Sequence, residues 1–160
     1  MIVTQEWIPD ILKAVLPGIA ISVFTSILTV RLAIRRFHEE KWWEKKQEMY
    51  SSLLETLHHM KNYVAEHYEG QLDSNYITDE KREELKKDWK MFSQKFAKLR
   101  DLASFHLSSE AVAVLERYEK KKIEANKSDS LFDMIDGELA AVSECLEELK
   151  IAAKRDLKVK

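Results

Sequence analysis

The stretch AVLPGIAISVFTSILTV, residues 14–30, decides the fold because it is 17 residues long and carries no charged side chain. Extending it to Ile34 adds only one charge, Arg31, and gives 21 residues. A helix rises about 1.5 Å per residue, so these residues would form a helix of about 31 Å, close to the thickness of a bilayer core. The sequence therefore predicts a transmembrane helix, with a buried core helix as the alternative.

A cleaved signal peptide fits the flanking residues poorly. Such a peptide begins with a basic region and ends at small residues that a peptidase cuts. Here the start carries Glu6 and Asp10, and ILTVRLAIRR (residues 27–36) offers no such site. We therefore expect an N-terminal transmembrane segment over residues 1–35 and a separate domain over residues 36–160.

The basic residues around the span predict its orientation. Lys13 is the only one before it, whereas six follow closely: Arg31, Arg35, Arg36, Lys41, Lys45 and Lys46. Basic residues favour the cytoplasmic side, so the N-terminus is expected outside and the C-terminal domain in the cytoplasm. Membrane lipid is the first expected partner.

One face of the predicted span consists of small or hydroxyl-bearing side chains: Gly18, Ser22, Thr25, Ser26 and Thr29. Steps of three and four residues place them on the same side of a helix. Such a face suits close contact between helices, which predicts a homo-oligomer, and a water-filled pore is a special case of that contact. The alternative is that each hydroxyl bonds back to its own helix.

The composition predicts an all-α protein. The 160 residues include only three Gly and two Pro, and none of these lies between Ile19 and Glu69. The transmembrane helix should therefore continue to a stop at Gly70. Three further amphipathic helices are expected, capped by Thr78, by Ser108 or Ser109, and by Ser130. Their short connectors predict a cytoplasmic four-helix bundle that continues from the transmembrane helix.

Two adjacent tryptophans, Trp42 and Trp43, lie in FHEEKWWEKK (residues 37–46). At helical spacing they share an apolar stripe with Tyr50, Leu53 and Leu57. We interpret them as the joint between membrane helix and bundle, forming the first layer of the cytoplasmic core. A headgroup anchor is the alternative.

Several functional classes receive no support. The net charge of −2 gives no strong nucleic-acid signal. The single cysteine, Cys145, permits neither a disulfide within the chain nor a cysteine zinc site. The Glu-x-x-His spacing of di-iron bundles occurs once, at Glu55 and His58, where two copies are needed. No metal and no cofactor are therefore expected.

RDLASFH, residues 100–106, has the Arg and His spacing typical of the HEPN fold, a helical bundle that often cleaves RNA. In that interpretation Arg100 and His106 are catalytic. The arginine would hold the phosphate, and the histidine would move protons during attack by a 2′-hydroxyl. The alternative places Arg100 on a solvated helix face and His106 at a helix end. The family pattern allows four to six residues between the Arg and the His, and Arg31 and His38 also satisfy it, so the pattern also arises by chance.

Three segments resemble a group of small bacterial proteins with one N-terminal span and a helical cytoplasmic domain. They are FHEEKWWEKKQEMYSSLLETLHHMKNY (residues 37–63), LASFHLSSEAVAVL (residues 102–115) and AKRDL (residues 153–157). The group is similar to the membrane accessory proteins of type VI-B CRISPR loci. That resemblance implies a HEPN-like bundle in the bacterial inner membrane and a ring-like pore. It also implies a role in phage defence beside an RNA-guided nuclease.

The expected function is therefore a homo-oligomer that permeabilises or depolarises the membrane. Two alternatives stay open. One is a membrane-anchored, metal-independent HEPN-type ribonuclease that uses Arg100 and His106. The other is a membrane-tethered adaptor that binds a cytoplasmic partner.

Overall fold

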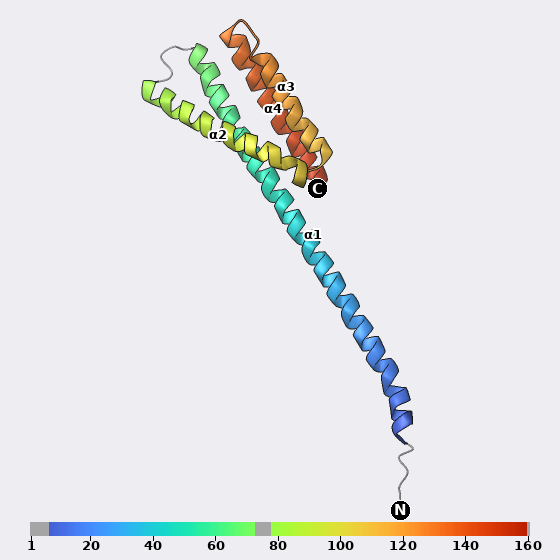
Figure 1. Ribbon diagram of the computed structural model, residues 1–160. Helices are drawn as coiled ribbons and strands as arrows, with labels where there is room; N and C mark the ends of the chain where they lie inside the picture. Colours follow the sequence, from blue (N-terminus) through green and yellow to red (C-terminus); the bar gives the residue numbers. More distant parts are fainter. Residues whose placement is uncertain (1–6, 73–77, 160) are drawn as a thin grey trace, which may run out of the picture. The chain divides into compact units, whose positions relative to one another are not determined.

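The computed structural model describes the backbone of residues 7–72 and 78–159, and the side chains from residue 17 to 70 and from 78 to 159. Over these residues the chain forms four helices and no strand (Figure 1). They are α1 (Trp7–Leu72), α2 (Asp79–His106), α3 (Ser109–Ala125) and α4 (Leu131–Asp156). The prediction of an all-α protein is confirmed. By its internal contacts the chain divides into an N-terminal unit, Met1–Trp42, and a C-terminal unit, Trp43–Lys160.

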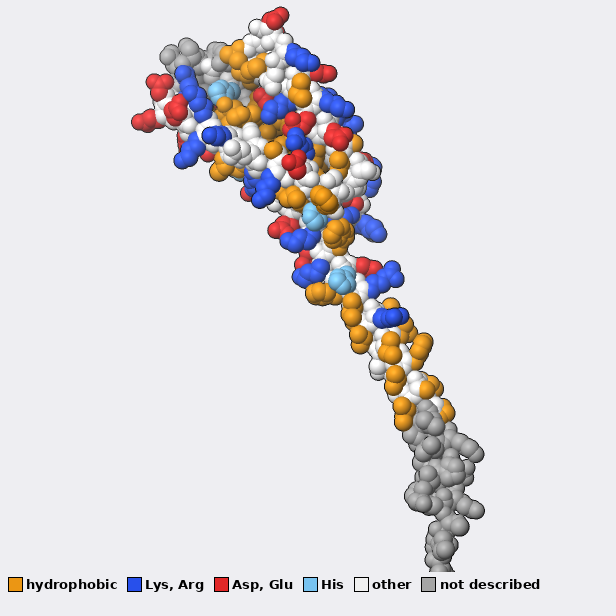
Figure 2. Space-filling model, viewed as in Figure 1, with side chains coloured by type: hydrophobic (Ala, Val, Ile, Leu, Met, Phe, Trp, Pro, Cys, Tyr) orange, Lys and Arg blue, Asp and Glu red, His pale blue; other side chains and the backbone are white. Residues whose placement is uncertain are grey.

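The N-terminal unit contains the apolar part of α1. This is the one helix, among the residues searched, whose length and composition would allow it to cross a membrane. All of its described side chains, from residue 17 to 42, are exposed. Figure 2 shows hydrophobic side chains over the surface of this stretch. Within its own unit the apolar segment is therefore uncovered.

The helix boundaries follow from local chemistry. Thr78, Ser108 and Ser130 are the N-caps of α2, α3 and α4, as predicted. Their hydroxyl oxygens accept from the backbone N–H three residues later, at 3.3, 3.4 and 3.5 Å, which satisfies one open donor at each helix start. The predicted stop at Gly70 is wrong by two residues. No described glycine has a positive φ, so Gly70 does not form the left-handed cap that would end α1.

The C-terminal unit has one core to which all four helices contribute. Leu53 and Leu57 of the predicted stripe on α1 are buried there, and so are Val142 and Leu149, which recur at helical spacing on α4. From α2 and α3, Phe96 meets Tyr118 edge-on, with ring centroids 5.3 Å apart. Helical spacing from Phe92, Phe96 and Leu99 predicts that Leu102 on α2 also points inward; this prediction is wrong, because that side chain is exposed.

Helices α3 and α4 lie side by side, as Figure 1 shows. A Cβ added to Gly137 on α4 would lie 3.0 Å from the Cβ of Ala125 on α3, so the glycine allows the two backbones to approach closely. Ion pairs hold their outer edges, among them Arg117 with Glu148 at 2.9 Å. The sequence analysis did not single out Gly137, because only the contact with α3 shows why a side chain is absent.

The single thiol should report on unfolding. Cys145 is buried in the core, and burial raises the pKa of its thiol to about 12. A buried, protonated thiol reacts poorly, so we expect maleimide to label the native full chain at least about 100-fold more slowly than an exposed cysteine. The control is a Ser51→Cys variant, whose new thiol on an exposed position of α1 should react at once. Rapid labelling of both thiols in native protein would show that this core opens readily.

Candidate functional site

The small face of α1 keeps its hydroxyl groups bonded within the helix. Ser22 donates to the carbonyl oxygen of Ile19, and Thr25, Ser26 and Thr29 each donate to the carbonyl four residues earlier, all at 2.8 Å. The structure therefore has the arrangement given above as the alternative, in which each hydroxyl bonds back to its own helix. A hydroxyl that already donates a hydrogen bond costs less free energy to place in an apolar medium. Its oxygen can still accept a hydrogen bond from a neighbouring helix.

Gly18 extends this face. A Cβ placed there would meet nothing within 4 Å, so no contact inside the chain requires a glycine. The prediction that this face meets other copies of the chain stays a prediction. A larger side chain at Gly18 would nevertheless change only the outer surface of the helix.

The tryptophans do not form a buried core layer. Trp42 is 51% exposed and Trp43 is 44% exposed, which corrects the expected first layer of the bundle. The buried core of the C-terminal unit begins at Met49, nearly two turns later on α1. The Trp43 indole N–H donates to the carbonyl oxygen of Leu157 at 3.4 Å, so this ring lies at the edge of its unit. The role of the pair as a joint stays a prediction.

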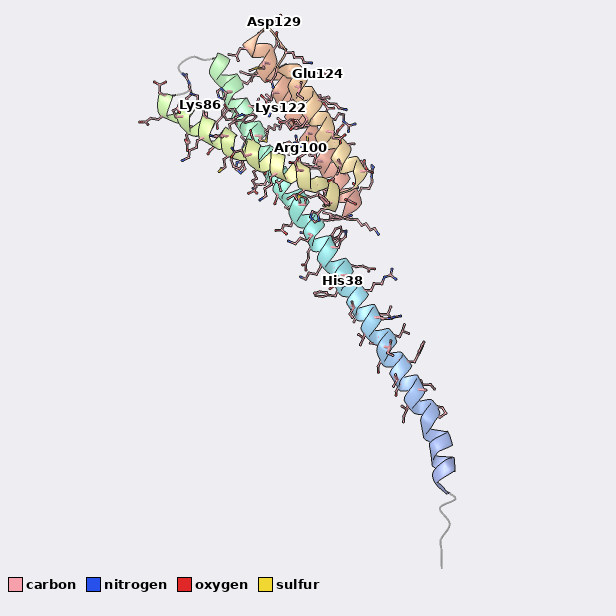
Figure 3. All side chains as sticks on the ribbon, viewed as in Figure 1. His38, Lys86, Arg100, Lys122, Glu124 and Asp129 are labelled. Carbon is pink, nitrogen blue, oxygen red and sulfur yellow. The ribbon has the colours of Figure 1, made fainter. Side chains whose placement is uncertain are left out.

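Arg100 is engaged by carboxylates. Its guanidinium lies 3.1 Å from Asp101 and 3.2 Å from Glu119 on α3. Two carboxylates at the guanidinium would oppose the approach of a phosphate. Figure 3 labels Arg100 on α2.

His106 is the last residue of α2. Six helical positions separate it from Arg100, which corresponds to about 120° around the axis and about 9 Å along it. The two residues therefore do not share a helix face. This arrangement favours the alternative in which Arg100 belongs to surface ion pairs and His106 to a helix end.

A cluster around Asp156, here called the Asp156 cluster, joins several polar groups of the C-terminal unit. One carboxylate oxygen lies 3.0 Å from the Lys46 ammonium. The other accepts from the Tyr50 hydroxyl at 2.9 Å and from the Ser108 backbone N–H at 3.1 Å. The side chains of Asp156 and Lys46 are only 13% and 23% exposed. This single carboxylate thus holds α1, the start of α3 and the end of α4 together.

The electrostatics of the Asp156 cluster favour an ionised carboxylate. Burial by itself would raise the pKa of Asp156, but the hydrogen bonds from Lys46 and Tyr50 outweigh burial, and the pKa is lowered. Burial is also the main cause that raises the pKa of Tyr50, which therefore stays a hydroxyl donor. Among the residues searched, no three His, Cys, Asp or Glu side chains gather as metal ligands would. The cluster is therefore suited to holding helices together rather than to binding a metal.

The three segments that carry the family resemblance meet at this cluster. Lys46 and Tyr50 belong to residues 37–63, Ser108 to residues 102–115 and Asp156 to residues 153–157. The cluster was not predicted from the sequence, although one signal was present. An aspartate in the last turn of a helix opposes the helix dipole, so it indicates a specific partner for the carboxylate.

Comparison of the chain with protein-family models, with curated proteins and with solved structures finds no match.

Proposed function

We propose that this protein is a single-pass membrane protein that self-associates through the apolar part of α1 and permeabilises its membrane. The observation that carries this proposal is the exposed apolar stretch of residues 18–34. Ile21 and Phe24, for example, are 66% and 69% exposed. Soluble monomers rarely expose so large a continuous apolar surface, and a lipid bilayer would cover it.

The charges after the stretch support an orientation with the C-terminal domain in the cytoplasm. Arg35 and Arg36 follow the apolar residues directly and pair with Glu39 and Glu40 one turn later, at 3.0 and 3.1 Å. These pairs are exposed, so the positive band stays accessible to lipid headgroups. The positive-inside rule then places the N-terminus outside.

Self-association is supported by the small face of α1. Glycine and hydroxyl side chains let two helix backbones approach closely in lipid. Hydroxyls that already bond to their own helix still expose an oxygen, so a ring of such helices would present a polar inner surface. The resemblance to the CRISPR accessory proteins supports phage defence as the setting for this activity.

The test compares Gly18→Leu with Ala20→Leu in cells. The two positions are about 160° apart on the helix, and both are exposed. The wild-type chain and Ala20→Leu should lower the membrane potential and migrate as oligomers in mild detergent. Gly18→Leu should weaken assembly by about tenfold and keep the potential normal, because bulk on the small face separates the helices.

Two outcomes would contradict the proposal. A monomeric wild-type chain that leaves the membrane potential unchanged would overturn it entirely. If the chain forms oligomers but leaves the membrane potential unchanged, permeabilisation is overturned and self-association stands. A clash inside the chain cannot explain a Gly18→Leu effect, since the added Cβ meets open space.

A membrane-tethered adaptor is the second candidate, and an exposed aromatic side chain favours it. Phe105 on α2 is 71% exposed, and Leu102, one turn earlier, is exposed as well. Together they would give a partner a small apolar contact. Assembly without any change of membrane potential would support this candidate.

A further inference from the structure

A cavity of about 600 Å³ lies within the C-terminal unit, and all four helices line it. Its polar lining includes His67 on α1, Arg82 on α2, Lys122 on α3 and Glu138 on α4. Small-molecule sites typically have volumes of about 300–1,000 Å³. The cavity shares no lining residue with the Asp156 cluster, so it is a separate feature of the unit.

Two residues that line the cavity each have a buried polar atom without a hydrogen bond among the described residues. The atoms are Nε2 of His67 and Oε1 of Glu138. The Lys122 ammonium lies 3.7 Å from that glutamate oxygen, which is longer than a hydrogen bond. Buried polar atoms are normally bonded, so two open ones on residues that line the same cavity are consistent with a bound molecule there.

The charges of the lining favour an anion. Arg82 and Lys122 are two cations against the one carboxylate of Glu138. The only ion pair of Arg82 within the described chain is long, 3.8 Å to Asp79, so its guanidinium is available. Burial and the nearby Arg82 lower the pKa of His67, so its ring is neutral and can donate one N–H. The lining therefore carries about one net positive charge.

The apolar part of the lining is aliphatic rather than an open aromatic platform. The Tyr63 ring stacks on Trp89 with centroids 4.6 Å apart, and the Lys122 ammonium lies 4.8 Å from the Trp89 centroid. The indole is therefore already covered by protein groups. A ligand body would pack on Val64 and Ile135 instead.

We propose that this cavity binds a small amphipathic carboxylic acid. Its carboxylate pairs with Arg82 and accepts the His67 N–H, and its apolar body packs on Val64 and Ile135. A hydroxyl or amine at the other end donates to Glu138. Lys122, labelled in Figure 3, belongs to α3, and its ammonium lies 3.7 Å from Oε1 of Glu138.

The probe pair is 4-(4-aminophenyl)butyrate and its neutral amide, 4-(4-aminophenyl)butyramide. Binding to the full chain in phosphatidylcholine nanodiscs is measured by saturation-transfer NMR, with empty nanodiscs subtracted. The acid should bind saturably. The amide should bind about tenfold more weakly, because its neutral end cannot form the charge-assisted hydrogen bonds of a carboxylate. Arg82→Gln should weaken the acid by a similar factor, whereas Lys87→Gln, on an exposed position more than 100° away on α2, should not.

Leu131→Trp is the occlusion variant. Leu131 lines the cavity but is exposed, so a larger side chain there should fill the entrance without disturbing the core. It should abolish binding of the acid. Binding no greater than that of empty nanodiscs, equal binding of acid and amide, or unchanged binding in Arg82→Gln would each overturn the proposal. None of these results bears on assembly in the membrane.

Discussion

Replacing Tyr118 by alanine is expected to lower the free energy of unfolding of the C-terminal unit by about 3–5 kcal/mol. The ring is among the largest fully buried side chains and meets Phe96 edge-on at 5.3 Å. Truncation would leave a cavity that the surrounding helices can close only in part. The measurement is a urea titration of the full chain, followed by the labelling rate of Cys145, which lies in the same core.

Tyr118→Phe is the matched control. The Tyr118 hydroxyl is buried, and no described residue accepts from it or donates to it. Removing an unsatisfied hydroxyl while keeping the ring should leave stability unchanged or raise it slightly. A phenylalanine variant as unstable as the alanine variant would show that the hydroxyl, rather than the ring, stabilises this core.

Asp156→Asn should have the second-largest effect, a loss of about 2–3 kcal/mol at neutral pH. The amide has nearly the same shape but no charge, and its NH₂ group would face one of three donors: Lys46, Tyr50 or the Ser108 N–H. Glu147→Gln is the control on the same helix. It breaks an exposed pair with Lys150, which should matter little because solvent screens such pairs. Equal losses in both variants would contradict the special position of Asp156.

The effect of Asp156→Asn should also depend on pH. The pKa of Asp156 is lowered in the folded chain, so folding favours the ionised carboxylate. Its stabilisation is complete above the ordinary aspartate pKa of about 4 and is lost as pH falls through the lower folded value. The difference between wild type and Asp156→Asn should therefore shrink below about pH 4. A constant difference would mean that shape rather than charge is responsible.

The features that the sequence predicted correctly are local ones. Thr78, Ser108 and Ser130 cap helices because each hydroxyl reaches a donor only three residues ahead. The buried positions of α1 and α4 follow from helical periodicity. Periodicity shows which face of a helix is apolar but not where the neighbouring helices begin. Trp43 was therefore placed on the right stripe and wrongly inside the core.

The features that the sequence did not predict depend on distant residues that meet. Asp156 and Lys46 are 110 positions apart, and no local pattern links them. The need for a glycine at Gly137 arises only from Ala125 on the adjacent helix. Arg100 has the spacing of a nuclease motif, but its partner Glu119 lies on another helix, and that contact changes its interpretation.

The burial of the only thiol gives the chain a practical advantage for spectroscopy. A cysteine introduced at an exposed position can carry a spin label while the natural Cys145 stays unmodified. Phe24→Cys would place the label within the apolar stretch, and Ser51→Cys would place it on the C-terminal unit. Dipolar coupling between labels on separate chains would then count the copies in one particle and give their spacing, with the native core intact.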